Sequence, residues 1–263
     1  MTSILSAHGV GKSFGSHAII RDLTFNAREG EFISVAGPSG CGKTTLLMCI
    51  AGLLKLDVGS VEFQGQKISE PPPGLAVVFQ DYSRSLLPWK SNMENVVFGM
   101  KRLENLSAKE KHERGAEILS SVGLRGFEKH YPWQVSGGMQ QRVAIARALA
   151  ANSKLLLLDE PLAAVDAQTR ADMQDLLLEL AAKYKQTCLL VTHDVDEAVY
   201  LADRVIVLSN RPTHVIEEIE VPLKSPRDQI ATRSDPIFLD LRARILSRIK
   251  SLKGPGGNAD MPH

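Results

Sequence analysis

The sequence feature that most constrains the fold is the loop at residues 37–44, Gly-Pro-Ser-Gly-Cys-Gly-Lys-Thr. An apolar run, Phe32–Ala36, precedes the loop and predicts a buried strand, and the apolar spacing of Thr44–Leu54 predicts a helix. Strand, glycine-rich loop and helix in this order fit the phosphate-binding pattern G-x-x-x-x-G-K-[ST]. The alternative, a glycine-rich turn with a chance Lys-Thr, does not explain both flanking elements.

Each residue type in the loop suits phosphate chemistry. Glycines let backbone N–H groups approach phosphate oxygens closely, and the helix N-terminus adds the positive end of a dipole. Lys43 can reach the β- and γ-phosphates, and the Thr44 hydroxyl is placed to bind Mg²⁺. The residues predicted to contact the nucleotide here are Gly37, Pro38, Ser39, Gly40, Cys41, Gly42, Lys43, Thr44 and Thr45.

Composition narrows the class of protein. The 263 residues can bury a sizeable core, and a formal net charge of +1 leaves no basic footprint for nucleic acid. Three cysteines without zinc spacing suit a reducing compartment. Met1–Gly9 lacks the order of a signal peptide, and no apolar run approaches the ~18 residues that cross a bilayer. We therefore expect a soluble chain that, in transport, would need other chains to form the pore.

The remaining pattern predicts an α/β fold with a helical insertion at about residues 88–150. Antiparallel strands are expected at Ile4–Val10 and Ala18–Phe25, and a further strand at Gly59–Ile68. Later strands are expected at Leu75–Phe79, Leu155–Leu158, Cys188–Thr192, Val205–Leu208 and Val215–Val221. Helices are expected at Asn92–Met100, Ala108–Val122, Gly137–Ala150, Ala167–Tyr184 and Val195–Leu201. This alternation implies a mostly parallel sheet with helices on both faces.

The C-terminal part is predicted to be a separate segment, residues 234–263, after a domain at residues 1–233. Asp235 is predicted to cap an amphipathic helix whose apolar stripe includes Phe238, Leu241 and Ile245. We interpret it as packed on its own domain; its basic face leaves a membrane-surface role as the weaker alternative. Residues 254–263 are expected to be disordered.

Two carboxylates follow the leucine run Leu155–Leu158, and a buried strand that ends in such a pair is unusual unless the pair serves a site. Asp159 suits the Mg²⁺ role that accompanies a phosphate loop. Glu160 suits a general base that polarises the attacking water, which typically contributes ~10²–10⁴-fold to rate. The alternative is a pair of solvated carboxylates at a strand end.

A second helix N-terminus that is suited to bind an anion lies at Val135–Arg142, where Ser136 can cap the helix and Gly137 and Gly138 are its first residues. A chain that holds one nucleotide has no obvious use for two such sites. If two chains pair head to tail, however, Ser136–Gly138 of one chain can cover the γ-phosphate held by Lys43 of the other. Taken alone, the stretch is also compatible with an ordinary capped helix.

Together these residues resemble the ATP-binding subunits of ABC transporters, with a P-loop NTPase (RecA-like) core. Gly37–Thr44 matches the Walker A motif, Val135–Arg142 the signature and Leu155–Glu160 Walker B. Three shorter matches are the Q-loop at Gln80, the D-loop at Leu162–Asp166 and the switch histidine at His193. The resemblance covers about residues 1–220. The departures are Val135 for leucine and Met139 for glutamine in the signature, and Val165 for leucine in the D-loop.

The resemblance implies a role for each matching residue. Phe14 would stack on adenine, the alternative being a core aromatic. Gln80 would contact Mg²⁺ and the attacking water, and His193 would bond the γ-phosphate and orient Glu160. Asp166 would organise the dimer interface, or cap a helix, or do both. The implied metal ligands are Thr44, Gln80 and Asp159, and the implied nucleotide contacts from the second copy are Ser136, Gly137, Gly138 and Gln140.

Further motifs resemble the importers of nitrate, taurine and aliphatic sulfonates. Leu86-Leu87-Pro88-Trp89, which reads as exposed, lies where the family receives a helix of its membrane subunits; the alternative is local packing. Tyr131–Gln134 and Ser234–Pro236 add to the likeness. The resemblance implies a homodimer at the cytoplasmic face of the plasma membrane, with permease subunits, a separate solute-binding protein and no nucleic acid. The implied function is ATP-driven uptake of a small anionic solute.

Three other interpretations remain at this stage. ABC ATPases that act on DNA or ribosomes carry long coiled coils or tandem ATPase domains, and neither is visible in this sequence. A nucleotide-dependent regulator without turnover would not need Glu160 and His193. An exporter half shares all the motifs but is more often fused to a membrane domain.

Overall fold

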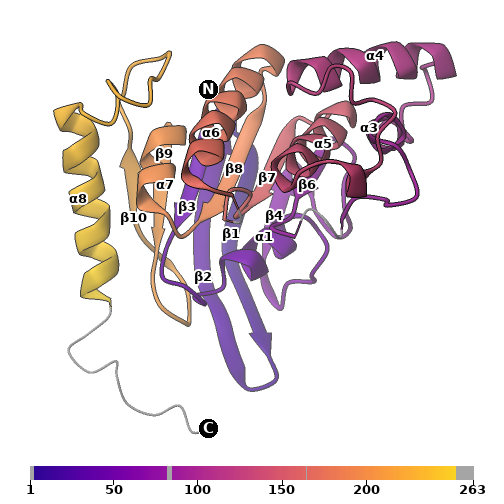
Figure 1. Cartoon of the computed structure of the whole chain (residues 1–263). Helices are drawn as coiled ribbons and strands as arrows, with labels where there is room; N and C mark the ends of the chain where they lie inside the picture. Colours follow the sequence, from indigo (N-terminus) through magenta and orange to yellow (C-terminus); the bar gives the residue numbers. More distant parts are fainter. Residues whose placement is uncertain (1–2, 82–84, 164, 253–263) are drawn as a thin grey trace, which may run out of the picture.

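Strand β3, Phe32–Ala36, lies within a six-stranded sheet of order β10-β9-β3-β8-β7-β6 (Figure 1). The computed structural model describes residues 3–81, 85–163 and 165–252. The other strands of this sheet are β6 Leu75–Val78, β7 Leu155–Asp159, β8 Thr187–Thr192, β9 Arg204–Leu208 and β10 Val215–Glu220. All are parallel except β10, which runs antiparallel to β9. Five strands therefore end at the same edge of the sheet.

A second, antiparallel sheet has the order β2-β1-β4-β5. Its strands are β1 Ser3–Phe14, β2 His17–Arg28, β4 Val58–Phe63 and β5 Gln66–Lys67. The predicted single strand Gly59–Ile68 is wrong, because the chain turns back on itself between β4 and β5. Gln64 and Gly65 have φ values of +51° and +74°, which a continuous strand cannot accommodate.

The parallel sheet separates two apolar cores, and the alternation of side chains along its strands fills both. In β7, Leu156 and Leu158 face the helical side, whereas Leu155 and Leu157 face the antiparallel sheet. The helices are α1 Lys43–Ile50, α3 Asn92–Gly99, α4 Ala108–Ser121, α5 Gly137–Ala150, α6 Ala167–Tyr184, α7 Val195–Leu201 and α8 Pro236–Ser251. The predicted α/β class is confirmed, although α1 shares its face of the sheet with the antiparallel strands.

The segment between β6 and β7 is helical, and its described residues contain no strand. Capping boxes at Ser91/Glu94 and Ser107/Glu110 begin α3 and α4. Helix α1 ends earlier than the predicted Leu54 because Gly52 leaves the helix with φ +70°.

Helix α8 packs on the domain that precedes it, as the amphipathic pattern predicts. The Asp235 side chain accepts a hydrogen bond from the backbone N–H of Ile237 (2.8 Å), and Phe238 and Ile245 enter the helix-side core. The basic face of the helix pairs within the chain, with both Arg244 and Arg248 on Glu217 and Arg242 on Asp196. The domain boundary at residue 234 remains a prediction, and residues 254–263 lie outside the described residues.

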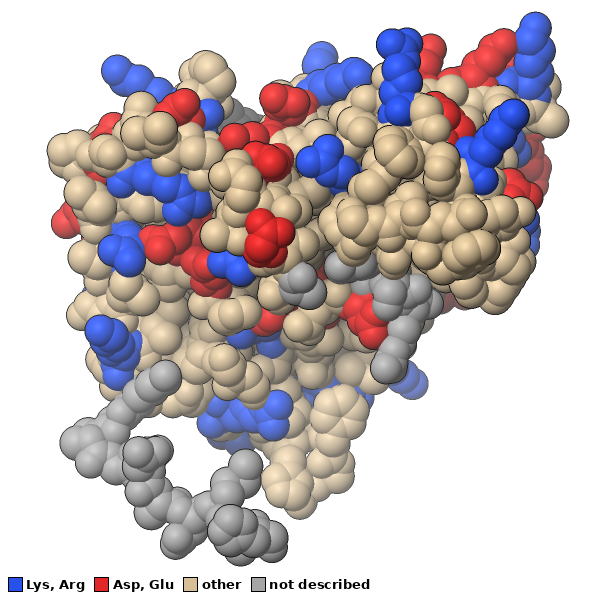
Figure 2. Space-filling view, viewed as in Figure 1, with Lys and Arg blue, Asp and Glu red and all other residues tan. Residues whose placement is uncertain are grey.

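The surface carries charges of both signs, with Lys and Arg interspersed among Asp and Glu on the face shown in Figure 2. Among residues 3–81, 85–163 and 165–252, no helix combines the length and the apolarity required to span a bilayer.

We predict that Ile245→Ala lowers the free energy of unfolding by about 2–5 kcal/mol, because it opens a cavity in a core that α8 shares with the sheet. Chemical denaturation measures the change. Leu239→Ala, on the exposed side of the same helix, is the control and should stay within about 0.5 kcal/mol of wild type. Equal effects of the two changes would mean that α8 does not belong to this core.

Candidate active site

The loop at residues 37–44 joins β3 to α1 at the carboxyl edge of the parallel sheet. Gly42 has φ +117°, and a Cβ there would lie 2.6 Å from Ile19 Cγ2, so that only glycine fits this position without a shift. The buried Thr213 hydroxyl donates to the carbonyl of Cys41 and fixes the loop from the opposite side. The loop is thus held in place by strand β2 and by the segment before β10.

Lys43, in the first turn of α1, is almost completely buried. Its ammonium donates to the carbonyls of Gly37 and Pro38, at 3.1 Å each. A buried cation, positive-φ glycines and a helix N-terminus meet in one loop, which is the chemistry expected of a phosphate site. Ser39 and Gly40 are exposed at the tip of the loop, and Thr45 is partly buried on the following turn.

The side chains of Thr44 and Asp159 are in direct contact, since the Thr44 hydroxyl donates to Asp159 Oδ1 at 3.1 Å. Burial raises the pKa of Asp159, and the hydrogen bond from Thr44 partly offsets this. A buried carboxylate beside a hydroxyl is stabilised by a divalent cation, so these two groups fit Mg²⁺, which usually takes one or two carboxylates and keeps several waters. The described residues contain no cluster of three or more His, Cys, Asp or Glu that would suit an all-protein metal cage.

Glu160 and His193 lie at the ends of the neighbouring strands β7 and β8. Glu160 Oε2 is 3.0 Å from His193 Nδ1, and their side chains are 19% and 52% exposed. Glu160 has φ +44°, and its N–H bonds to the carbonyl of Val191 (2.9 Å). Positive φ is uncommon for a residue other than glycine and is often found at functional sites. The two side chains therefore contact each other within reach of solvent, and a backbone hydrogen bond fixes Glu160.

Gln80 follows β6, the neighbour of β7, and is exposed at the same edge of the sheet. Phe14 ends β1 and is 51% exposed, with Lys12 Nζ 5.6 Å from its ring centroid. The alternative interpretation of Phe14 as a core aromatic is therefore wrong, because the residue is exposed and Lys12 lies over its ring.

The signature segment belongs to the helical layer. Ser136 caps α5 by accepting from the N–H of Met139 (3.3 Å), and the Gln140 side chain donates to the carbonyl of Val135 (3.4 Å). Helix α5 packs on α3, α4 and β6, whereas α1, which carries Lys43, packs on β7 and β8. The N-termini of α1 and α5, which are both suited to bind an anion, thus lie in different layers of one chain.

Asp166 caps α6 by accepting from both the N–H and the hydroxyl of Thr169, and these hydrogen bonds lower the pKa of Asp166. The helix-cap interpretation is therefore confirmed, and an interface role remains compatible with it. Ala164, in the same predicted motif, lies outside the described residues.

The predicted exposed run Leu86–Trp89 is only partly exposed. Leu86 is 2% exposed and lies in the helix-side core, which corrects the prediction, whereas Trp89 is 71% exposed. An apolar leucine here completes the packing beneath α3, so only Pro88 and Trp89 reach the surface fully.

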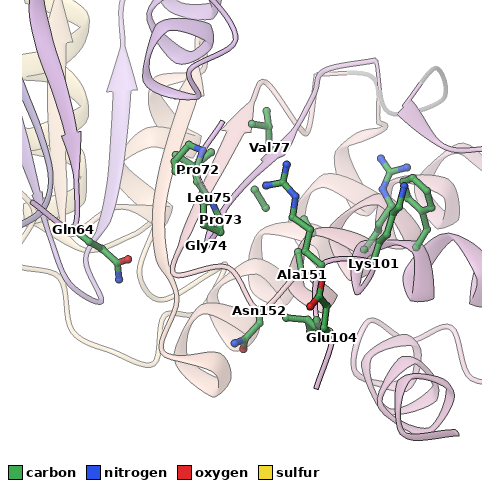
Figure 3. A pocket seen from close by; sticks show the side chains of 17 residues that line it. Gln64, Pro72, Pro73, Gly74, Leu75, Val77, Lys101, Glu104, Ala151 and Asn152 are labelled. Carbon is green, nitrogen blue, oxygen red and sulfur yellow. The ribbon is translucent and has the colours of Figure 1, made fainter. Parts of the chain in front are cut away.

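A groove of about 1000 Å³ lies between the start of β6 and the ends of α3 and α5. Figure 3 shows Pro72 and Gly74 on one side of it and Lys101 on the other, with Ala151 and Asn152 between them.

Sequence reasoning missed a group of side chains behind the Glu160–His193 pair. They line a small cavity of about 50 Å³ and include Arg170, Thr192, Asp194 and Glu197. The only signal in the sequence was Asp194, a good N-cap before the predicted helix Val195–Leu201.

Comparison with known proteins decides the family. Residues 20–163 match the family model described as ABC transporter. The chain belongs to the ABC transporter family. It is an ATP-binding and ATP-hydrolysing subunit of that family.

Its relatives cover nearly the whole chain. The taurine import ATP-binding protein TauB of Escherichia coli (strain K12) is 44% identical over 242 residues, 90% of this chain and 93% of TauB. The nitrate import ATP-binding protein NrtD of Synechococcus elongatus is 43% identical over 251 residues, 93% of this chain and 91% of NrtD. Among solved structures, the dimeric ATP-binding cassette MJ0796, bound to ADP and Pi, is 33% identical with a TM-score of 0.73, covering 82% of this chain and 98% of MJ0796.

We predict that Gly42→Ala lowers the affinity for ATP by roughly 100-fold or more, because the added Cβ must push the loop away from Ile19 at a φ that strains alanine. Titration calorimetry with ATP measures the affinity. Gly65→Ala is the matched control, with φ +74° and open space around the added Cβ. The account of the loop fails if Gly42→Ala binds ATP as wild type does.

Proposed function

We propose that the chain binds ATP with Mg²⁺ between two copies of itself, hydrolyses it, and drives import of a small anionic solute through separate membrane subunits. The observation that carries the proposal is the convergence of Lys43, Thr44–Asp159 and Glu160–His193 on one edge of the sheet. These three groups supply a phosphate-binding loop, a cation site and a general base that is oriented by a histidine.

The nucleotide lies with its phosphates on residues 37–45. Lys43 leaves the carbonyls of Gly37 and Pro38 for the β- and γ-phosphates, because phosphate oxygens carry more charge than a carbonyl. The exposed ring of Phe14 takes the adenine by stacking.

Thr44, Asp159 and Gln80 hold the Mg²⁺ at the edge of the sheet. The bound ion neutralises charge that develops on the phosphate oxygens. The Thr44–Asp159 hydrogen bond supports this assignment because it brings a hydroxyl and a buried carboxylate to the same point.

Glu160 accepts the proton of the attacking water, and His193 orients Glu160 and bonds the γ-phosphate. The 3.0 Å contact between their side chains supports this division of roles. Gln80, which follows β6 beside β7, positions the same water from the side opposite His193.

Two copies complete the site. Ser136, Gly137, Gly138 and Gln140 of one copy cover the γ-phosphate on the other, and Asp166 lies at the interface between the copies. Because Ser136 and Lys43 sit on different layers of one chain, a second copy is the simplest way to bring both to one phosphate. The dimeric form of the similar cassette MJ0796 supports this arrangement.

The membrane subunits dock beside Leu86–Trp89, with Trp89 as the main contact. Docked in this way, the chain is a peripheral subunit at the cytoplasmic face of the membrane. The similarity to taurine and nitrate import proteins supports uptake of taurine, nitrate or a sulfonate. A separate solute-binding protein selects that solute.

We predict that Glu160→Gln lowers kcat for ATP hydrolysis by about 10²–10⁴-fold, because the amide cannot accept a proton from water. ATP affinity should persist, since Lys43 and the phosphate loop are intact, and the ATP-bound dimer should accumulate. Phosphate release and size-exclusion chromatography in ATP measure the two effects.

Glu220→Gln, which removes an exposed carboxylate far along the chain in β10, is the control and should hydrolyse ATP as wild type does. Unchanged turnover in Glu160→Gln would contradict the assignment of the base.

We predict that Trp89→Ala weakens co-purification with the co-expressed permease subunits of the same transporter by roughly tenfold or more, because exposed aromatic anchors dominate such interfaces. ATP hydrolysis by the isolated chain should not change. Ile230→Ala, at another exposed apolar side chain, is the control. Docking at this surface is refuted if both variants retain the permease equally.

A further inference from the structure

Glu197 lies in the first turn of α7 and is 4% exposed, yet it is ionisable. Its side chain lines the cavity of about 50 Å³ that Glu160 and His193 also line. A buried carboxyl is costly unless it is paired, so its position beside the Glu160–His193 pair requires an explanation.

The Thr192 hydroxyl connects Glu197 to the chain on either side of His193. It donates to Glu197 Oε2 and accepts from the N–H of Asp194 at 3.1 Å. Asp194 in turn caps α7 by accepting from the N–H of Glu197 at 3.1 Å. The residues before and after His193 are therefore tied to one carboxyl group.

The second oxygen, Glu197 Oε1, is buried and has no hydrogen-bond partner in the described part of the chain. Burial raises the pKa of Glu197 to about 7. The hydrogen bond from Thr192 and the charge of Arg170 on α6 oppose the rise, whereas Asp194 before α7 and Glu160 after β7 add to it.

We propose that Glu197 is a positioning residue for ATP hydrolysis, which holds His193 against Glu160 through the hydroxyl of Thr192. This inference rests on the proposed function, because it assigns a support to the same hydrolytic pair. Glu197 itself touches neither the nucleotide nor the attacking water. It fixes the backbone on both sides of the histidine, and thereby the 3.0 Å contact between His193 and Glu160.

A purely structural role and a positioning role predict different kinetics. Loss of stability alone would leave kcat of the folded enzyme unchanged. Loss of positioning should lower kcat while leaving KM for ATP nearly unchanged, since the phosphate loop does most of the binding. Glutamine can keep the hydrogen bond from Thr192, so Glu197→Gln should preserve function, whereas the apolar Glu197→Met cannot.

The experiment measures kcat and KM of the full chain for Glu197→Met, Glu197→Gln, Thr192→Val and the double variant Glu197→Met/Thr192→Val. We expect Glu197→Met and Thr192→Val each to lower kcat roughly tenfold to 100-fold, as misplacement of a catalytic group does. The double variant should lose little more than either single one, because both remove the same hydrogen bond. Glu197→Gln should stay within about threefold of wild type.

Asp196→Asn is the matched control. It neutralises an acid one residue earlier in the same turn, but that carboxylate pairs with Arg242 of α8 rather than facing the site. Its kcat should equal that of wild type. Thr192→Val keeps the β-branched shape in a strand, so it tests the proposal even if Glu197→Met does not fold.

Wild-type kcat in folded Thr192→Val, or in folded Glu197→Met, would overturn the proposal. A fall in kcat in Glu197→Gln as large as that in Glu197→Met would also overturn it, because the hydrogen bond would then not be the cause. Absence of turnover in the wild-type chain would instead refute the proposed function on which the inference rests.

Discussion

The parallel order of β9, β3, β8, β7 and β6 is the constraint on which the site depends, because parallel strands end at one edge. The phosphate loop follows β3, Glu160 follows β7, His193 follows β8 and Gln80 follows β6. Groups that lie far apart in the sequence thereby meet without any long loop to position them. The chemistry of the site is largely a consequence of strand order, and each side chain needs only a short extension to reach it.

Several residues at this edge of the sheet have an unfavourable backbone conformation or a buried ionisable group. Glu160 holds a positive φ, Asp159 has a raised pKa, and one Glu197 oxygen has no hydrogen-bond partner among the residues that the structure describes. Two apolar cores, one on each face of the sheet, stabilise these groups. Burial of that apolar surface is the dominant favourable term, so the fold can hold a strained and partly desolvated site that bound nucleotide and cation would relieve.

Much of the fold was predictable from local signals. The bounds of α5, α6 and α7 follow from apolar periodicity and from the caps Ser136 and Asp166, and the motif residues lie at strand ends as predicted. The hairpin at Gln64–Gly65 was missed although the alternation of Val61 and Phe63 stops there, because Ile68 resembles a continuation of it despite its odd spacing from Phe63. The burial of Leu86 was missed because an apolar run does not reveal which side packs. The support formed by Glu197 joins two residues that are close in sequence, but apolar periodicity and capping patterns do not indicate that the Glu197 side chain turns back onto Thr192.

Whether the site is shared between two copies is the central claim, and cross-linking tests it most directly. Ser39 at the tip of the phosphate loop and Ser136 before α5 are both exposed, and the native cysteines are buried. The double variant Ser39→Cys/Ser136→Cys, oxidised in the presence of ATP, should form a disulfide between two chains that runs as a dimer on a non-reducing gel. Neither single variant should link position 39 to position 136. A disulfide formed only within one chain, or none in the presence of ATP, would contradict the two-copy site.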